Sequence, residues 1–158
     1  MVTIRPAEPQ DGPALFTLAR AFATSFAVER TAFEQALAEL LTHPEAFLSV
    51  AEADGEVAGY VLGFDHLTFF ANGRVAWVEE IMVGASFRRQ GVGRHLIEAF
   101  EAWATTREAK MIALATRRAS DFYKALGYEE SAAYFRKRLS GCIGKSPQHL
   151  PGASYKGR

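Results

Sequence analysis

The sequence has little of what would tie it to an oxidising compartment, a metal centre or a membrane. Cys142 is the single cysteine, so no internal disulfide can form and no zinc site of four cysteines can be built. No two of the four histidines have metal-ligand spacing. No apolar run approaches the roughly 20 residues that span a bilayer, and the N-terminus has no apolar signal core. We expect a cytoplasmic protein with no metal and no membrane contact.

A net charge is also absent. Eighteen Lys and Arg residues balance eighteen Asp and Glu residues, so no global positive field points to a nucleic-acid partner. Hydrophobic residues make up 49% of the chain and charged residues 23%, which is typical of a globular protein of one domain at this length. We expect that domain over residues 1–139, followed by a Gly- and Pro-rich C-terminal extension over residues 140–158.

Hydrophobic periodicity predicts a strand and two helices in the first third of the chain. Residues 2–5 alternate as a short strand does, and apolar side chains at helical spacing follow over residues 13–26. A second apolar stripe begins after Thr31 and Glu34, which have the spacing of a helix-capping box, and it stops before Pro44.

Turn dipeptides then separate three predicted strands. Residues 47–53 and 57–64 are joined by Asp54-Gly55, a dipeptide favoured in two-residue hairpin turns, so these strands should be antiparallel. Asn72-Gly73 marks another turn, and a long apolar strand over residues 75–83 follows it.

The last third of the chain alternates between helical and strand patterns. A helical face runs over residues 92–103, a short strand over 111–115 and a helix over 119–126 that ends at Gly127. Residues 132–139 can return as a last strand. The predicted order is β-α-α-β-β-β-α-β-α-β.

A glycine-containing stretch joins the long strand to the helix that follows it. Unsatisfied amides and the positive end of a helix dipole attract an anion at such a position. Glycines let the backbone approach a phosphate and arginines supply positive charge, although two glycines are also typical of a plain turn. A Walker loop and a dinucleotide fingerprint fit less well, since the first needs Gly-Lys and the second a third glycine. The stretch is Arg88-Arg89-Gln90-Gly91-Val92-Gly93-Arg94.

Two motifs, in the right order, resemble those of the GCN5-related N-acetyltransferase (GNAT) family. Residues 88–93 match its Arg/Gln-x-x-Gly-x-Gly/Ala motif, and residues 119–128 look like its last helix and the strand after it. The resemblance covers residues 3–139 and implies an α/β (α+β) GNAT-like domain, with a mixed, mostly antiparallel sheet flanked by about four helices. One departure is Thr116, which stands where many members have an asparagine that helps to hold the cofactor.

The resemblance implies direct transfer of an acetyl group from acetyl-coenzyme A (acetyl-CoA) to a primary amine of a small molecule, peptide or protein. It implies no acyl-enzyme and no role for Cys142, and it leaves a homodimer open. A catalytically inactive CoA-binding or sensing module and a binder of another phosphate ligand are the alternatives. The residues expected to bind the cofactor are Met82 and Val83, through backbone amides, and Arg88, Arg89, Gln90, Gly91, Val92, Gly93 and Arg94.

Two side chains are candidates for the chemistry. An alkyl amine with a pKa near ~10.4 must lose a proton before it attacks, and Glu80, in an apolar strand where family members often carry a base, is the candidate acceptor of that proton. Strand alternation would put Glu79 on the opposite face. Tyr123 stands where the family's general acid often sits, and it should hydrogen-bond the leaving thiolate or have a lowered pKa. The alternatives are a salt-bridged carboxylate and a packing tyrosine.

Overall fold

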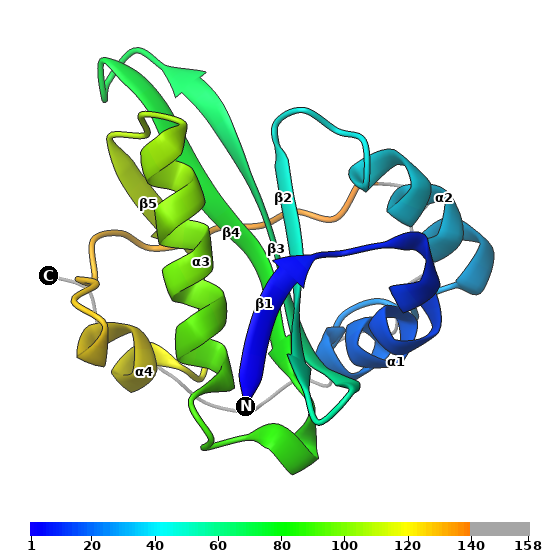
Figure 1. Cartoon of the computed structure of the whole chain (residues 1–158). Helices are drawn as coiled ribbons and strands as arrows, with labels where there is room; N and C mark the ends of the chain where they lie inside the picture. The colour runs from blue at the N-terminus through cyan, green and yellow to red at the C-terminus, as the bar shows by residue number, and fades with distance from the viewer. Residues whose placement is uncertain (140–158) are drawn as a thin grey trace, which may run out of the picture.

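The computed structural model describes residues 1–139, which form a five-stranded sheet with helices on both faces (Figure 1). Cys142, His149 and the expected extension over residues 140–158 lie outside the described residues. In the described part of the chain, no helix is both long enough and apolar enough to cross a membrane. The elements in chain order are β1 (Val2–Pro6), η1 (Pro9–Asp11), α1 (Gly12–Phe22), α2 (Arg30–Leu40), β2 (Ala46–Ala53), β3 (Glu56–Thr68), β4 (Gly73–Val83), η2 (Ala85–Phe87), α3 (Val92–Thr106), β5 (Met111–Leu114) and α4 (Ser120–Ala125).

The sheet has the simple strand order β1-β2-β3-β4-β5. Neighbouring strands from β1 to β4 are antiparallel, and only β5 runs parallel to its neighbour β4. The hairpin turn predicted between β2 and β3 is confirmed, because Asp54 and Gly55 both have positive φ, 52° and 80°, as a type I′ turn requires. The predicted mixed, mostly antiparallel sheet is therefore confirmed.

Two hydrophobic cores cover the two faces of the sheet. On one face, Leu96, Ile97 and Phe100 of α3 are fully buried against the sheet, together with Val61 of β3. On the other face, α1 and α2 pack against strand residues that include Tyr60 and Leu62. We call these the α3 face and the α1/α2 face.

Two local predictions are wrong. The proposed capping box fails because α2 begins at Arg30, which places Thr31 inside the first helical turn instead of at the cap. The predicted last strand over 132–139 has no regular secondary structure. Its alternation finds no strand partner, and the segment runs to the α1–α2 connection, where Arg136 Nη1 donates a hydrogen bond to Ser25 Oγ at 2.8 Å.

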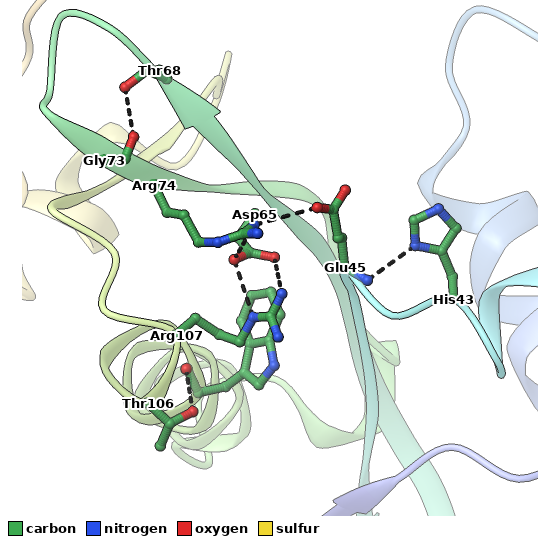
Figure 2. Close-up of polar contacts among 9 residues, drawn as sticks. His43, Glu45, Asp65, Thr68, Gly73, Arg74, Thr106 and Arg107 are labelled. Carbon is green, nitrogen blue, oxygen red and sulfur yellow. Dashed lines mark hydrogen bonds and ion pairs between the residues drawn. The ribbon is translucent and has the colours of Figure 1, made fainter.

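A buried ion network ties β3, β4 and the end of α3 together, away from the β4 C-terminus (Figure 2). The Asp65 side chain has no exposed surface. Its carboxylate accepts a hydrogen bond from Arg74 Nη1 at 2.9 Å and two from Arg107, from Nε and Nη2, both at 3.1 Å. Arg74 also reaches Glu45 at 3.3 Å. The buried charge is thus fully paired.

Replacing Asp65 should cost much of the protein's stability. Asp65→Ala leaves two guanidinium groups without their shared carboxylate, and we expect a loss of about 3 kcal/mol in the free energy of unfolding. Urea unfolding of the purified variant measures it. Glu39→Ala removes the same charge from an exposed position of α2 and should stay within about 0.5 kcal/mol of the wild type. Equal effects of the two changes would contradict a stabilising role for the network.

Candidate active site

β4 contains a bulge at the position of the two glutamates. Leu62 of β3 lies opposite Glu80, but the next residue, Gly63, lies opposite Val78, so Glu79 is an extra residue without a partner. Val78 packs on the α3 face, whereas Met82 packs on the α1/α2 face. Strict alternation would put residues 78 and 82 on the same face, so it does not hold across the bulge, and the prediction that Glu79 and Glu80 point to opposite faces loses its basis.

The bulge presents Glu80 to a buried tyrosine on the α1/α2 face. The hydroxyl of Tyr60 donates a hydrogen bond to Glu80 Oε2 at 2.5 Å, and Tyr60 is only 3% exposed. Burial raises the pKa of the Glu80 carboxyl, the hydrogen bond from Tyr60 lowers it, and the charge of Glu79 raises it again. The net shift is upward, which makes this carboxylate a stronger base than an ordinary glutamate.

Tyr60 is a site residue that the sequence analysis missed. It pairs with Met82 across the β3–β4 ladder, and Glu80, two residues before Met82, is its diagonal neighbour on the same face. The pKa of Tyr60 is raised by burial and by the neighbouring Glu80, so the phenol keeps its proton and remains a donor. The only sign of this role in the sequence was the phenol hydroxyl of Tyr60 within an otherwise apolar strand.

The end of β4 has an open edge. β5 pairs with β4 only from Val75 to Val78, so within residues 1–139 the rest of β4 has no strand partner on that side. Pairing with β3 continues as far as Val83, opposite Gly59. The Gly84 amide donates a hydrogen bond to the Ala58 carbonyl at 2.8 Å, so by strand alternation the backbone of Met82 faces β3 and that of Val83 faces the open edge. The Val83 amide is therefore open to a ligand.

The loop after β4 leads directly into α3 and is exposed to solvent. Arg89 and Gly91 both have left-handed backbones, with φ of 62° and 82°, and Gly91 is the residue that precedes the helix. Arg88 Nε donates a hydrogen bond to the Val83 carbonyl at 3.3 Å, and Gln90 Nε2 donates one to the Ser86 carbonyl at 2.9 Å. The first amides of α3 thus lie at the end of the open stretch of β4, where an anion would be attracted.

The remaining residues of the stretch have distinct surroundings. Val92 is 1% exposed and anchors α3 in the core, so only its backbone is available to a ligand. Gly93 lies under the last helix: a Cβ there would be 3.4 Å from Phe122 and 3.8 Å from Val83. Its lack of a side chain therefore also allows α4 to pack closely, a reason that the sequence analysis did not foresee. Arg94 is exposed.

Tyr123 lies on the α3 face and is only 7% exposed. Its ring packs edge-on against Phe122 and Tyr128, with centroids 5.0 and 5.7 Å away. No group within residues 1–139 forms a hydrogen bond with its hydroxyl. Burial raises its pKa, which argues against the lowered pKa considered from the sequence and leaves hydrogen-bond donation to a thiolate.

The structure places the two candidate catalytic side chains on opposite sides of β4. Glu80 meets Tyr60 of the α1/α2 face, whereas Tyr123 belongs to the α3 face. No hydrogen bond joins them within residues 1–139. Thr116, the departure from the family pattern, has a structural partner, because its Oγ1 accepts a hydrogen bond from the Ala119 amide at 3.1 Å. No three His, Cys, Asp or Glu side chains gather as metal ligands in the described residues.

A mixed sheet that opens beside one strand, at a loop entering a helix, is the arrangement that the two sequence motifs implied for a CoA-dependent acyltransferase. The acetyltransferase (GNAT) family matches residues 13–128, and the chain belongs to this family. It is an acetyl-CoA-dependent N-acetyltransferase. The resemblance that the two motifs suggested is confirmed.

Known relatives agree with this assignment. Aminoglycoside N(6')-acetyltransferase type 1 from Salmonella typhimurium is 31% identical over 98 residues, which cover 56% of this chain and 68% of the relative. Glucosamine-6-phosphate N-acetyltransferase from Arabidopsis thaliana has a similar fold, with a TM-score of 0.79 at 18% identity over 89% of this chain and 99% of its own. AAC(6')-Iy in complex with a CoA bisubstrate analogue has a TM-score of 0.74 at 24% identity over 88% and 99% of the two chains.

Proposed function

We propose that the open stretch of β4 and the loop after it hold acetyl-CoA. The observation that carries this proposal is their closeness: the open edge of β4 at Val83 lies beside the first turn of α3, since a Cβ on Gly93 would be 3.8 Å from the Val83 side chain. The diphosphate would meet the first amides of α3 and the positive charges of Arg88, Arg89 and Arg94, while the pantetheine would pair with the backbone of β4. Gln90 and Val92 would contribute backbone amides. Gly93 would allow α4 to pack closely against the start of α3.

The acceptor amine would approach from the α1/α2 face, where Glu80 lies. The raised pKa of the Glu80 carboxyl favours uptake of the amine proton, directly or through one water molecule. The amine nitrogen then bonds to the thioester carbon, the bond from that carbon to sulfur breaks, and the sulfur leaves as a thiolate. The Val83 amide, at the open edge, would polarise the carbonyl oxygen as negative charge develops there.

Tyr123 would act from the other face of β4. Its hydroxyl has no protein partner in residues 1–139 and keeps its proton, since burial raises the pKa. Such a phenol can donate a hydrogen bond to the departing thiolate, whose final proton comes from the phenol or from solvent. The separation of Glu80 and Tyr123 fits this division, because the amine and the cofactor would enter from different sides.

The acceptor is a primary amine of a small molecule, peptide or protein. The relatives named above act on aminoglycosides and on glucosamine-6-phosphate, so the family's fold serves quite different acceptors. Independence from metals, a cytoplasmic location and the absence of nucleic-acid and membrane partners stay predictions, and the question of a homodimer stays open.

Turnover of acetyl-CoA tests these roles. With a broad panel of primary amines, we expect release of free thiol, and Tyr123→Phe should lower kcat by roughly 10- to 100-fold because the thiolate loses its hydrogen-bond donor. Cofactor affinity, measured by calorimetry, should change little. Tyr134→Phe removes a hydroxyl from an exposed tyrosine and is the control. Wild-type protein that binds CoA but releases no thiol with any amine would favour the sensing module instead.

A further inference from the structure

A hollow of about 530 Å³ lies at the connection between α1 and α2, apart from the candidate cofactor site. Its lining combines the rings of Phe16 and Phe26 with the guanidinium groups of Arg20 and Arg30, and Glu29 is the one carboxylate among its lining residues. Such a mixture of aromatic and cationic groups suits a ligand that carries negative charge.

Two of these cations are held on the same aromatic ring. The Arg30 guanidinium lies 4.1 Å from the centroid of Phe16, and that of Arg20 lies 5.7 Å from it. Arg30 also forms an ion pair with Glu34, at 3.6 Å. No carboxylate within residues 1–139 forms an ion pair with Arg20. Like charges brought to one ring repel each other, and an anion bound between them would relieve that repulsion.

The segment after α4 adds positive charge to the same place. In Figure 1 this segment, drawn in orange, runs from the α4 side of the sheet toward α2. Arg136 donates a hydrogen bond to Ser25 at 2.8 Å, and the Arg138 guanidinium lies 5.2 Å from the centroid of Phe26 in the wall of the hollow. Residues 132–139, which were predicted as a strand, therefore bring basic side chains to the α1–α2 connection.

The hollow lies at the end of the helix that covers the Glu80 face. Leu18 of α1 approaches Gly84, the residue after β4, since a Cβ on that glycine would be 3.7 Å from its side chain. Arg20 follows Leu18 by two residues, so its side chain leaves α1 on nearly the opposite side, and about the width of the helix, ~10 Å, lies between the hollow and the end of β4. An acceptor that reaches both places would pass around the C-terminal end of α1, which lies at Phe22.

We propose that this hollow binds an oxyanion, a carboxylate or phosphate, at the far end of the acceptor amine. The proposal rests on the function proposed above and names its acceptor class: a primary amine with an acidic group. It sets this chain apart from enzymes whose acceptors carry only positive charge, because a second ammonium group would meet Arg20, Arg30, Arg136 and Arg138.

Equilibrium binding to the CoA-saturated protein tests the proposal without requiring turnover. Saturation with CoA fills the other anion site, and calorimetry then compares four amines built on a six-carbon chain: aminohexanoate, aminohexyl phosphate, aminohexanol and hexanediamine. We expect at least one of the two acidic amines to bind about tenfold more tightly than the alcohol, and the diamine to bind most weakly. Equal affinities, or preference for the diamine, would overturn the proposal.

Variants assign the effect to the hollow. Arg20→Gln should reduce the acidic preference to about threefold or less, whereas Arg20→Lys should keep most of it. Lys110→Gln removes a positive charge from the exposed turn before β5 and is the matched control. If Lys110→Gln weakens binding as much as Arg20→Gln, the preference comes from net charge and not from the hollow.

Two further measurements distinguish anion binding in the hollow from binding elsewhere and from turnover. Inorganic phosphate alone should bind the CoA-saturated protein weakly and should compete with the acidic amine. Phosphate that binds without competing would place the anion elsewhere and overturn the assignment. If no amine releases thiol, the proposed function is contradicted. The binding preference would still show whether the hollow selects acidic ligands.

Discussion

Glu80→Gln should lower kcat by roughly 10²- to 10⁴-fold, the range found for removal of a general base. Glutamine has the same shape, and its carbonyl can still accept the hydrogen bond from Tyr60, so the fold and the cofactor site should be preserved. Stopped assays of thiol release with a saturating amine measure the loss. Cofactor affinity should stay within about threefold of the wild type, because Glu80 lies on the α1/α2 face and the cofactor loop does not contact it.

The pH dependence identifies the carboxyl as the base. Only the ionised form of Glu80 accepts a proton, so the rate should fall as pH drops through its raised pKa. Tyr60→Phe removes a hydrogen bond that lowers this pKa, so the pKa should rise and the acidic limb of the pH–rate profile should move to higher pH. A merely structural tyrosine would change the rate without moving the limb.

Glu79→Gln is the matched control for both changes. It removes the same charge from the neighbouring, exposed residue of the bulge. Because the charge of Glu79 raises the pKa of Glu80, its removal should move the acidic limb slightly to lower pH and leave kcat within about threefold. A large loss in Glu79→Gln with little in Glu80→Gln would transfer the role of base to the other glutamate.

Local chemistry made much of the fold predictable. Asp54-Gly55 demanded a tight turn of positive φ, and Gly127 has the left-handed backbone expected after the last helix, with φ of 90°. The loop at Gly91 was likewise predictable, since a strand, a short loop that ends at a glycine and a helix follow one another in the chain. These features depend on neighbours in the sequence, which is why pattern reasoning reached them.

The parts that failed depend on distant partners. The alternation within residues 132–139 was real, but a strand also needs a free edge of matching length, and the chain instead hydrogen-bonds with Ser25. Glu80 was found as an anomaly in an apolar run, yet its partner Tyr60 became visible only with the extra residue at Glu79. A one-residue bulge changes which face every later side chain occupies. The sequence pattern carries no sign of that insertion.

Gly91→Val should weaken CoA binding by at least about tenfold. At φ of 82° a branched side chain is strained, which costs about 1–3 kcal/mol at such a position. The space beside Gly91 is open, with only His95 within 4 Å of an added Cβ, so the unliganded loop can accommodate a side chain. The added bulk would lie where the diphosphate is proposed to approach. Calorimetric titration of CoA into the purified variant measures the change.

Gly55→Val separates damage to the cofactor-binding loop from a general loss of stability. Gly55 has nearly the same backbone, φ of 80°, and no atom within 4 Å of an added Cβ, but it lies in the β2–β3 hairpin. Both variants should lose similar stability in urea, and only Gly91→Val should lose affinity for CoA. Normal affinity in folded Gly91→Val would remove the loop from the cofactor site. Equal losses of affinity in both variants would trace the effect to stability, because the strain at the two glycines is matched and only their positions differ.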